Sequence, residues 1–439
     1  MFGYYLQLAW RSLKRSPGLT VLMIVAIAFG VSASMTTYSV FRAVSGDPIP
    51  WKSSRLFVPQ IDVWGPRSRR KGSVEPTEAL TYTDATALMR EHRAKWQSAL
   101  YAISPSVVPA GSGAHPLKSD GHAVYSEFFP MVDAPFLFGG GWSADDDRQR
   151  APVAVISSKL NQKLFGGKNS VGFPLNIDGK EYRIVGVLDN WNPQPRFYDV
   201  VNTNGFTNGT DDLFIPFERS IEANIDNDGN TNCAEPAKEP GFAGLKRSSC
   251  VWIPFLVQLD DSAAVSAYRD YLQGYANNQR KEGRFAWEPN NRLRDMPAWL
   301  EYQQVAPRDT KVSLMVALGL LVVCLINTVG LLLAKFLRRS GEIGVRRALG
   351  APRRAIYAQF LTEAGMIGIV GSVLGLVFTG VGVLGVGWVL PRNIAVLAKI
   401  DLSLLAMTLL VALISAVLAG AYPTFRASMI QPALQLKSN

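Results

Sequence analysis

Four long apolar runs constrain the fold of this chain more than any other feature. Each run spans about 20 residues or more without Asp, Glu, Lys, Arg or His, which is the length that a helix needs to cross the hydrocarbon core of a bilayer. The runs gather near the two ends of a 439-residue chain whose overall hydrophobic fraction is only 48%. We therefore predict four transmembrane helices, at residues 19–44, 312–335, 364–390 and 402–422.

The first apolar run follows a basic leader and has to be distinguished from a cleaved signal peptide. Its length exceeds the roughly 7 to 15 apolar residues of such a peptide, so we interpret it as a membrane anchor. Within the leader, Phe2, Tyr5 and Ala9 recur at helical spacing. Residues 1–18 are therefore predicted to form an amphipathic cytoplasmic helix in the membrane interface. A disordered tail is the alternative.

Basic residues beside the apolar runs indicate the orientation of the chain. Seven Lys and Arg residues lie at positions 335–354, between the uncharged parts of the second and third runs, and others precede the first and follow the fourth. Because short cytoplasmic segments carry an excess of Lys and Arg, we place both termini, the segment 336–363 and the tail 423–439 in the cytoplasm. Residues 45–311 then form a periplasmic domain, and residues 391–401 a short periplasmic loop. This clustering explains the net charge of +10 and argues against a nucleic-acid-binding domain.

The periplasmic domain is predicted to have an α+β fold. Residues 152–157 and 182–187 are β-branched runs bounded by turn residues, and residues 158–165 between them are helix-like. Residues 84–100 form a second helical candidate. We expect a mixed sheet with helices on one face. The predicted fold class is thus an α-helical membrane protein with four transmembrane helices and a large α+β periplasmic domain.

A polar excursion at residues 218–250 interrupts the periplasmic domain. It is rich in Asn, Asp, Gly, Glu and Pro, and it contains Cys233 and Cys250. Because the periplasm is oxidising, we predict a disulfide between these two cysteines. Two free thiols are the alternative, since the geometry of a cysteine pair cannot be read from sequence.

The same excursion partly matches a calcium-binding loop. Oxygen-bearing residues and the turn glycine of that pattern stand at the expected positions, which are occupied by Asn224, Asp226, Asp228, Gly229 and Glu235. However, Asn replaces the expected Asp at the first position, and Thr231 replaces a usually apolar residue. Short motifs often match by chance. We therefore favour a solvated, disulfide-closed loop and expect no metal site.

Catalytic motifs are missing from the sequence. Three histidines lack the spacing of a metal site or a catalytic triad, and residues 166–169 lack the upstream Gly and the Ser or Thr of an ATP-binding loop. The apolar runs also lack the ionisable residues that ion-driven transporters need, whereas Gly371 and Gly375 form a pair that favours close helix packing. We therefore predict a non-catalytic membrane subunit that takes its energy from a partner.

The cytoplasmic segment between the second and third runs has the pattern of two short helical pieces. Ser340 is placed to cap a helix with Glu342 near its positive end. Gly350 is placed to end that helix, and Pro352 to begin the next. Binding of the basic residues to anionic lipid would explain the charge. It would not explain the helix, glycine and helix pattern.

The residues of this segment carry the most specific resemblance in the chain. Residues 342–351 read EIGVRRALGA and residues 359–364 read QFLTEA. Both resemble the corresponding segments of the MacB/FtsX-type ABC permease family. In that family the segment forms the coupling helix that docks on a cytoplasmic ATPase. The resemblance therefore implies an ATPase-coupling role for Glu342, Ile343, Arg346, Arg347, Leu349 and Gly350.

A second resemblance covers the periplasmic domain. Residues 128–190 look like the MacB-type periplasmic core, and residues 212–216 with the following excursion fall where the family has a variable second subdomain. The stretch 423–434 resembles the basic end of the family but carries fewer arginines. The excursion has no counterpart in the family that would indicate its role. Together the resemblances run along nearly the whole chain in order.

The resemblance implies a permease of the bacterial inner membrane that works as a homo- or heterodimer. ATP and magnesium would bind to a separate ABC ATPase and not to this chain, which starts directly at the membrane helix. We expect the machine to export a small molecule or peptide together with a membrane-fusion protein and an outer-membrane channel. Signalling to a cell-wall hydrolase, as in FtsX-like relatives, and extraction of lipoproteins from the inner membrane are the alternatives.

Overall fold

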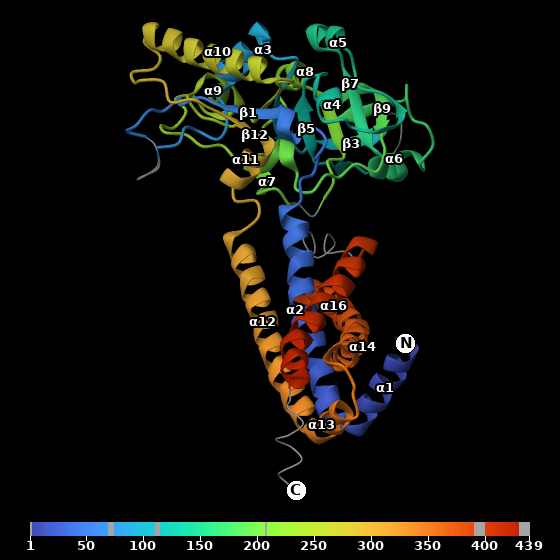
Figure 1. The fold of residues 1–439 in the computed structure, drawn as a ribbon. Coiled ribbons are helices and arrows are strands. Elements are labelled where there is room, and N and C mark those ends of the chain that lie inside the picture. Colours follow the sequence, from blue (N-terminus) through green and yellow to red (C-terminus); the bar gives the residue numbers. More distant parts are fainter. Residues whose placement is uncertain (1, 69–73, 110–114, 207–208, 390–399, 430–439) are drawn as a thin grey trace. The chain divides into compact units, whose positions relative to one another are not determined.

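The computed structural model describes residues 2–68, 74–109, 115–206, 209–389 and 400–429. The chain divides into two compact units. A helical unit comprises residues 1–46 and 306–439, and a sheet unit comprises residues 47–305 (Figure 1). Each unit is described by itself below.

Within the described residues, the helical unit has long apolar helices and two shorter ones. Four of the described helices are long and apolar enough to cross a membrane, which agrees with the predicted number. Helix α14 starts within the predicted cytoplasmic segment, and α16 runs through Pro423 into the predicted tail. The predicted loop 391–401 lies largely outside the described residues, as does the tail beyond Met429. The helices are α1 (Phe2–Arg15), α2 (Pro17–Ser45), α12 (Arg308–Leu337), α13 (Ser340–Ala348), α14 (Arg353–Val389) and α16 (Leu402–Ser428).

Small residues let the long helices approach one another. A Cβ atom on Gly371 would lie 3.4 Å from Cγ2 of Ile27, and one on Gly375 would lie 3.6 Å from Cα of Ala28. Both glycines of α14 therefore lie against α2 at ordinary contact distance. The closest approach is elsewhere, because a Cβ atom on Gly368 would come within 2.3 Å of the Ala416 Cβ. Only a residue without a side chain allows α14 and α16 to pack this closely.

A mixed sheet forms the sheet unit. Its strand order is β12-β1-β11-β2-β5-β10-β7-β9-β8-β3-β4, and β6 pairs with β9. The pairs β5–β10 and β7–β9 are parallel, whereas the other pairs are antiparallel. The strands are β1 (Leu56–Gln60), β2 (Trp96–Ile103), β3 (Ser106–Pro109), β4 (Leu117–Lys118), β5 (Gly121–Val124), β6 (Phe136–Gly139), β7 (Val153–Ser157), β8 (Pro174–Ile177), β9 (Lys180–Leu188), β10 (Leu213–Pro216), β11 (Phe255–Gln258) and β12 (Arg292–Asp295).

Short helices cover the sheet on both faces, so the prediction of helices on one face was wrong. Successive residues of a strand point to opposite faces, and in β7 Ala154 joins one hydrophobic core whereas Val155 joins another. Helices α3, α6, α8, α9 and α10 contribute to the first core, and α4, α7 and α11 to the second. The helices are η1 (Ser53–Arg55), α3 (Tyr82–Glu91), α4 (Phe128–Met131), α5 (Ala144–Gln149), α6 (Ser158–Phe165), η2 (Phe197–Asp199), α7 (Val200–Thr203), α8 (Phe217–Ala223), α9 (Gly241–Arg247), α10 (Ser262–Lys281) and α11 (Met296–Tyr302).

The helix predicted at residues 84–100 is shorter in the structure. Helix α3 ends at Glu91, and His92 adopts a left-handed conformation with φ of 46°. Trp96 then begins β2, which alternates between the two cores. The left-handed turn after Glu91 and the strand pairing with β11 and β5 override the helical spacing of the apolar residues.

A buried ionic cluster fastens the segment before β10 onto β5. His122 contacts Asp199 through Nε2 at 2.8 Å and Asp211 through Nδ1 at 3.0 Å. Arg196 pairs with Asp211 at 2.8 Å, and the Tyr198 hydroxyl donates to the same carboxylate at 2.5 Å. We call these five residues the His122 cluster. Burial by itself would lower the pKa of His122, but Asp211 and Asp199 outweigh it and raise the pKa to about 9.

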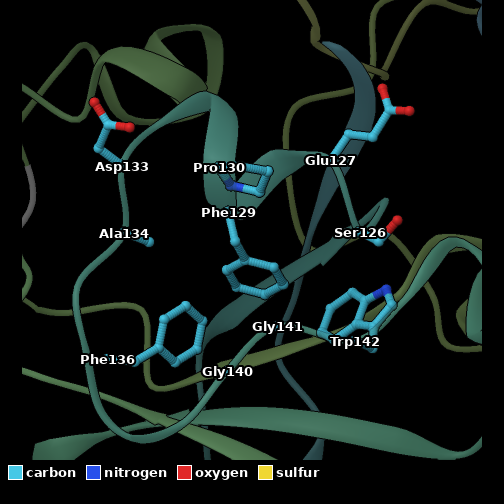
Figure 2. Close-up of a pocket in the computed structure, with 10 residues that line it drawn as sticks. All are labelled: Ser126, Glu127, Phe129, Pro130, Asp133, Ala134, Phe136, Gly140, Gly141 and Trp142. Atoms are coloured by element: carbon cyan, nitrogen blue, oxygen red, sulfur yellow. The ribbon is translucent and has the colours of Figure 1, made fainter.

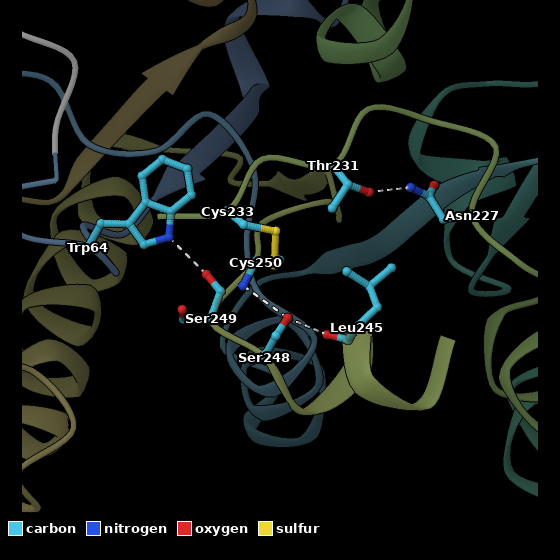
Figure 3. The surroundings of a disulfide bond; sticks show 8 residues. All are labelled: Trp64, Asn227, Thr231, Cys233, Leu245, Ser248, Ser249 and Cys250. Carbon is cyan, nitrogen blue, oxygen red and sulfur yellow. Dashed lines mark hydrogen bonds between the residues drawn. A yellow bond between two sulfur atoms is a disulfide. The ribbon is translucent and has the colours of Figure 1, made fainter. Parts of the chain in front are cut away.

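The polar excursion is held by a covalent bond. A disulfide links Cys233 to Cys250, 17 positions apart (Figure 3). Backbone hydrogen bonds between Asn232 and Val251, of 2.8 and 3.1 Å, pair the two chain segments beside it. Within the segment that partly matches a calcium-binding loop, the side-chain oxygen of Asn227 accepts a hydrogen bond from the Gly229 amide at 3.1 Å. This oxygen is therefore already used within the turn. Among the described residues no group of three or more His, Cys, Asp or Glu side chains is placed to hold a metal ion.

Candidate coupling site

Helix α13 and the turn after it carry the residues to which the sequence resemblance assigns ATPase coupling. The helix is capped at Arg339 without a side-chain hydrogen bond, so the prediction that Ser340 caps it was wrong. Gly350 follows the helix with φ of 95°, a conformation that disfavours any residue with a side chain. The Ala351 amide donates to the Arg346 carbonyl at 3.0 Å, which closes the turn before α14.

Glu342 and Arg346 are tied into the helical unit. Arg346 donates to the Glu342 carboxylate at 2.7 Å and to Oε1 of Gln359 in α14 at 2.9 Å. Glu342 also contacts Arg339 at 3.2 Å and Arg15 of α1 at 3.8 Å. The Glu342 side chain is about one-third exposed, so solvent weakens its ion pairs. They join α13 to three other segments of the unit.

Beneath α13 lies a more deeply buried set of charges. Lys335, at the end of α12, contacts the Glu363 carboxylate of α14 at 2.6 Å, and both side chains are at most 3% exposed. Ser12 of α1 donates to Glu363 at 2.5 Å, and Arg339 reaches it at 3.3 Å. We call Ser12, Lys335, Arg339 and Glu363 the Glu363 cluster. Because Arg339 also contacts Glu342, the cluster connects the buried helix ends to α13.

The sequence-based assignment missed most of the Glu363 cluster. From the sequence, Lys335 is one of the basic residues that place the segment between the second and third runs in the cytoplasm, and Glu363 is a residue that carries the family resemblance. Two signals were available. A lysine closing an apolar run needs a partner when it is buried, and Glu363 is an acidic residue at the start of another run. Lys335 and Glu363 are 28 positions apart along the chain, so a local sequence pattern does not reveal their contact.

The residues assigned to coupling differ in exposure. Leu349 is 83% exposed and its neighbour Val345 is 53% exposed, whereas Ile343 is only 3% exposed. Ile343 packs into the core of the helical unit with Phe336 and Phe360. The structure therefore separates an outward apolar face, formed by Val345 and Leu349, from Ile343, which holds the helix in place. Gly350 and half-buried Arg347 lie at the end of the same helix.

The sheet unit contains a separate hollow of about 600 Å³. Figure 2 shows the rings of Phe129, Phe136 and Trp142 within it, with Glu127 and Asp133 on either side. Both carboxylates already have partners. Glu127 accepts from the Gln97 amide at 2.7 Å, and Asp133 pairs with Lys52 at 2.9 Å. This hollow therefore offers aromatic surface but little charge that is not already paired.

Family models match two parts of the chain. A model described as the MacB-like periplasmic core domain matches residues 20–275, which is more than half of the chain. A model described as the FtsX-like permease C-terminal domain matches residues 314–432. The second match contains α13, the Glu363 cluster apart from Ser12, and the exposed residues Val345 and Leu349. These matches confirm the resemblance that the sequence motifs indicate.

Curated relatives cover the chain more broadly at lower identity. A pyoverdine export ATP-binding/permease protein of Pseudomonas entomophila is 24% identical over 99% of this chain and 59% of its own length. A macrolide export ATP-binding/permease protein of Bdellovibrio bacteriovorus is 23% identical over 67% of this chain and 40% of its own length. The chain thus spans roughly half the length of these relatives.

Solved structures resemble this chain only weakly. The periplasmic region of MacB from Actinobacillus actinomycetemcomitans matches with a TM-score of 0.37 and 13% identity, covering 58% of this chain and 94% of that one. A score of this size is too low to establish a shared fold. The two family models carry the assignment instead: this chain belongs to the MacB-like family of membrane permeases, with a MacB-like periplasmic core domain and an FtsX-like permease C-terminal domain.

Proposed function

We propose that this chain is the permease of an ABC-type exporter in the bacterial inner membrane, with both termini in the cytoplasm. A separate ABC ATPase binds ATP and magnesium and docks on α13. The permease acts as a homo- or heterodimer and passes the motion of the ATPase to its periplasmic domain. The periplasmic domain then drives export of a small molecule or peptide, together with a membrane-fusion protein and an outer-membrane channel.

The observation that carries this proposal is the pairing of an exposed face with a buried anchor on one short helix. Val345 and Leu349 present apolar side chains to the surroundings, and apolar exposure of this kind favours a protein partner. Through Arg339 and Glu342, the same helix is bonded to the ends of α1, α12 and α14. A push on α13 is therefore delivered to three helices together.

The names of the relatives support export as the outcome. Two of them are described as export ATP-binding/permease proteins, for pyoverdine and for macrolides. We do not assign the substrates of these relatives to this chain, because its identity to them is low and it covers only about half of their length. A small organic compound or peptide is the class of cargo that we propose here.

Replacing Leu349 with Asp tests the docking face. The change places a charge in the proposed interface without touching a buried residue, since Leu349 is 83% exposed. We expect the ATPase to stop copurifying with the permease, and stimulated ATP hydrolysis in reconstituted vesicles to fall by about tenfold or more. Thermal unfolding of the permease should be unchanged.

Leu137→Asp is the matched control, because Leu137 is also exposed, at 47%, but lies on β6 in the sheet unit. It should leave ATPase binding intact. Wild-type ATPase stimulation by Leu349→Asp would contradict the docking role of α13. If the permease captured a cell-wall hydrolase instead of a fusion protein and channel, signalling would replace export as its function. If depletion of the permease left lipoproteins in the inner membrane, lipoprotein extraction would replace export.

A further inference from the structure

A cavity of about 560 Å³ lies beside the disulfide in the sheet unit. It is built from the segment after β1, helix α7, the disulfide-linked segments and the end of α11. Its lining includes Trp64, Glu78, Val201, Cys233 and Tyr302. Cavities of about 300 to 1,000 Å³ with mixed apolar and polar lining are the usual size for small-molecule sites.

The charges around this cavity are unequally satisfied. Glu75 is paired with Arg294 at 2.6 Å, and Asp62 accepts from the Gly65 amide at 3.0 Å. Glu78 is exposed and has no hydrogen bond or ion pair with any described residue. The cavity therefore contains a carboxylate that is available to a ligand, which distinguishes it from the hollow beside Phe129.

Aromatic rings line the cavity together with this carboxylate. Trp64 is half-exposed, and its ring is oriented by a hydrogen bond of 2.8 Å from Nε1 to the Ser249 carbonyl (Figure 3). The Arg294 guanidinium already stands 4.1 Å from the centre of the Tyr302 ring, so this ring contributes apolar surface and not a free face for a further cation. Because the faces of Trp rings attract cations, Trp64 and Glu78 together favour a positively charged ligand.

The disulfide holds one wall of the cavity in place. Cys233 and Val251 line it, Cys250 is buried beneath it, and Asn232 is paired to Val251 beside it. Ser249, which orients Trp64, immediately precedes Cys250. Loss of the covalent link would free the wall and the acceptor of the Trp64 hydrogen bond together.

We propose that this cavity binds a small organic cation, with its ammonium group at Glu78 and its flat apolar body against Trp64 and Tyr302. The site goes beyond the proposed export function, since binding at the cavity requires neither the ATPase nor transport. If the experiments on α13 contradicted the export function, the proposal of a cation site in this cavity would still stand.

Tryptamine is a suitable probe, because it combines an indole ring with an ammonium group. Indole-3-propionate has the same ring with the opposite charge. Binding of both to the full chain in lipid nanodiscs is measured by calorimetry and by saturation-transfer NMR. We expect saturable binding of tryptamine, weakened about fivefold or more by Glu78→Gln, and much weaker binding of indole-3-propionate.

Two further variants keep the test decisive. Glu181→Gln removes an exposed carboxylate on β9, outside the cavity, and should leave binding unchanged. Val201→Phe fills the cavity without changing its charge and should abolish binding, even if Glu78→Gln proves unstable. Equal affinity of wild type and Glu78→Gln, equal binding of the two probes, or no saturable binding at millimolar tryptamine would each overturn the proposal.

Discussion

The two buried ionic clusters of this protein use the same chemistry in different settings. The His122 cluster joins residues 122 to 211 within one sheet unit, around a β-strand that has hydrophobic cores on both sides. The Glu363 cluster joins residues 12, 335, 339 and 363, and so brings together helices from both ends of the chain. The first closes a loop onto a framework that other contacts also hold. The second joins helix ends that also pack through Phe336, Ile343 and Phe360.

This difference follows from what drives packing in each unit. In the sheet unit, burial of apolar side chains from water provides the main driving force. Between apolar helices in a bilayer that force is absent, and packing of small residues and polar contacts takes its place. A buried ion pair is a weak source of stability in either setting, but removal of one partner is costly in both. The Glu363 cluster should therefore be the more sensitive of the two.

The largest effect is expected for Glu363→Ala. The change leaves the Lys335 ammonium buried at 3% exposure without its carboxylate, which should cost about 3–5 kcal/mol of stability. Hydrogen–deuterium exchange of the full chain in nanodiscs should rise in α1 and α13 and stay unchanged in β5. Equal exchange in all three would erase the distinction between the clusters.

The double variant Lys335→Met with Glu363→Leu separates charge burial from packing. Both charges are removed together, so stability should return to within about 1–2 kcal/mol of wild type. ATPase stimulation should not return with it, because Arg339 loses its bond to α14. Full recovery of both properties would show that the cluster has no coupling role.

The next largest effect on stability is expected from loss of the disulfide in the sheet unit. The described part of the helical unit has no disulfide. Replacing Cys233 and Cys250 with Ser opens a loop of 17 positions, which should cost about 3 kcal/mol. Exchange should increase at residues 232–251 before any other part of the sheet unit. A reducing agent should produce the same change in wild type and none in the double variant. Unchanged exchange after reduction would mean that the loop is held by its other contacts.

The features of this molecule that could be predicted from the sequence are those that local patterns of residues encode. The apolar runs identified the four long helices, and the runs at 152–165 matched β7 and α6 because a β-branched stretch and an amphipathic turn are local features. The position of Gly350 after α13 was likewise predictable, since only a residue without a side chain adopts its backbone conformation readily.

The features that could not be predicted from the sequence depend on contacts between residues that are far apart along the chain. The histidines showed no meaningful spacing, yet His122 meets Asp199 and Asp211 at 77 and 89 positions along the chain, because β5 pairs with β10. Helices on both faces of the sheet could not be foreseen, since a strand buried on both sides shows no alternation of polar and apolar residues. The Glu363 cluster required the helix ends to be brought together first.

A smaller effect is expected for His122→Ala. Asp211 keeps its contact with Arg196 at 2.8 Å, so only Asp199 loses its cationic partner completely. The free energy of unfolding should fall by about 2–3 kcal/mol, and exchange should rise in β5 and at residues 196–211 while α13 is unaffected. This is the reverse of the pattern expected for Glu363→Ala. Increased exchange of α13 in His122→Ala would show that the two clusters are not independent.

The smallest effect is a pH dependence confined to the sheet unit. The pKa of His122 in the folded chain is about 9, above its usual value of about 6.5, so its stabilising contribution is complete below pH 6.5 and is lost as the pH rises through 9. From pH 7 to pH 9 this loss amounts to about 2 kcal/mol. Asp147, whose pKa burial raises to about 6, has already ionised at pH 7 and adds little. Thermal unfolding measured at both pH values should therefore show a larger decrease in wild type than in His122→Ala, and equal decreases would contradict a charged His122 between its two carboxylates.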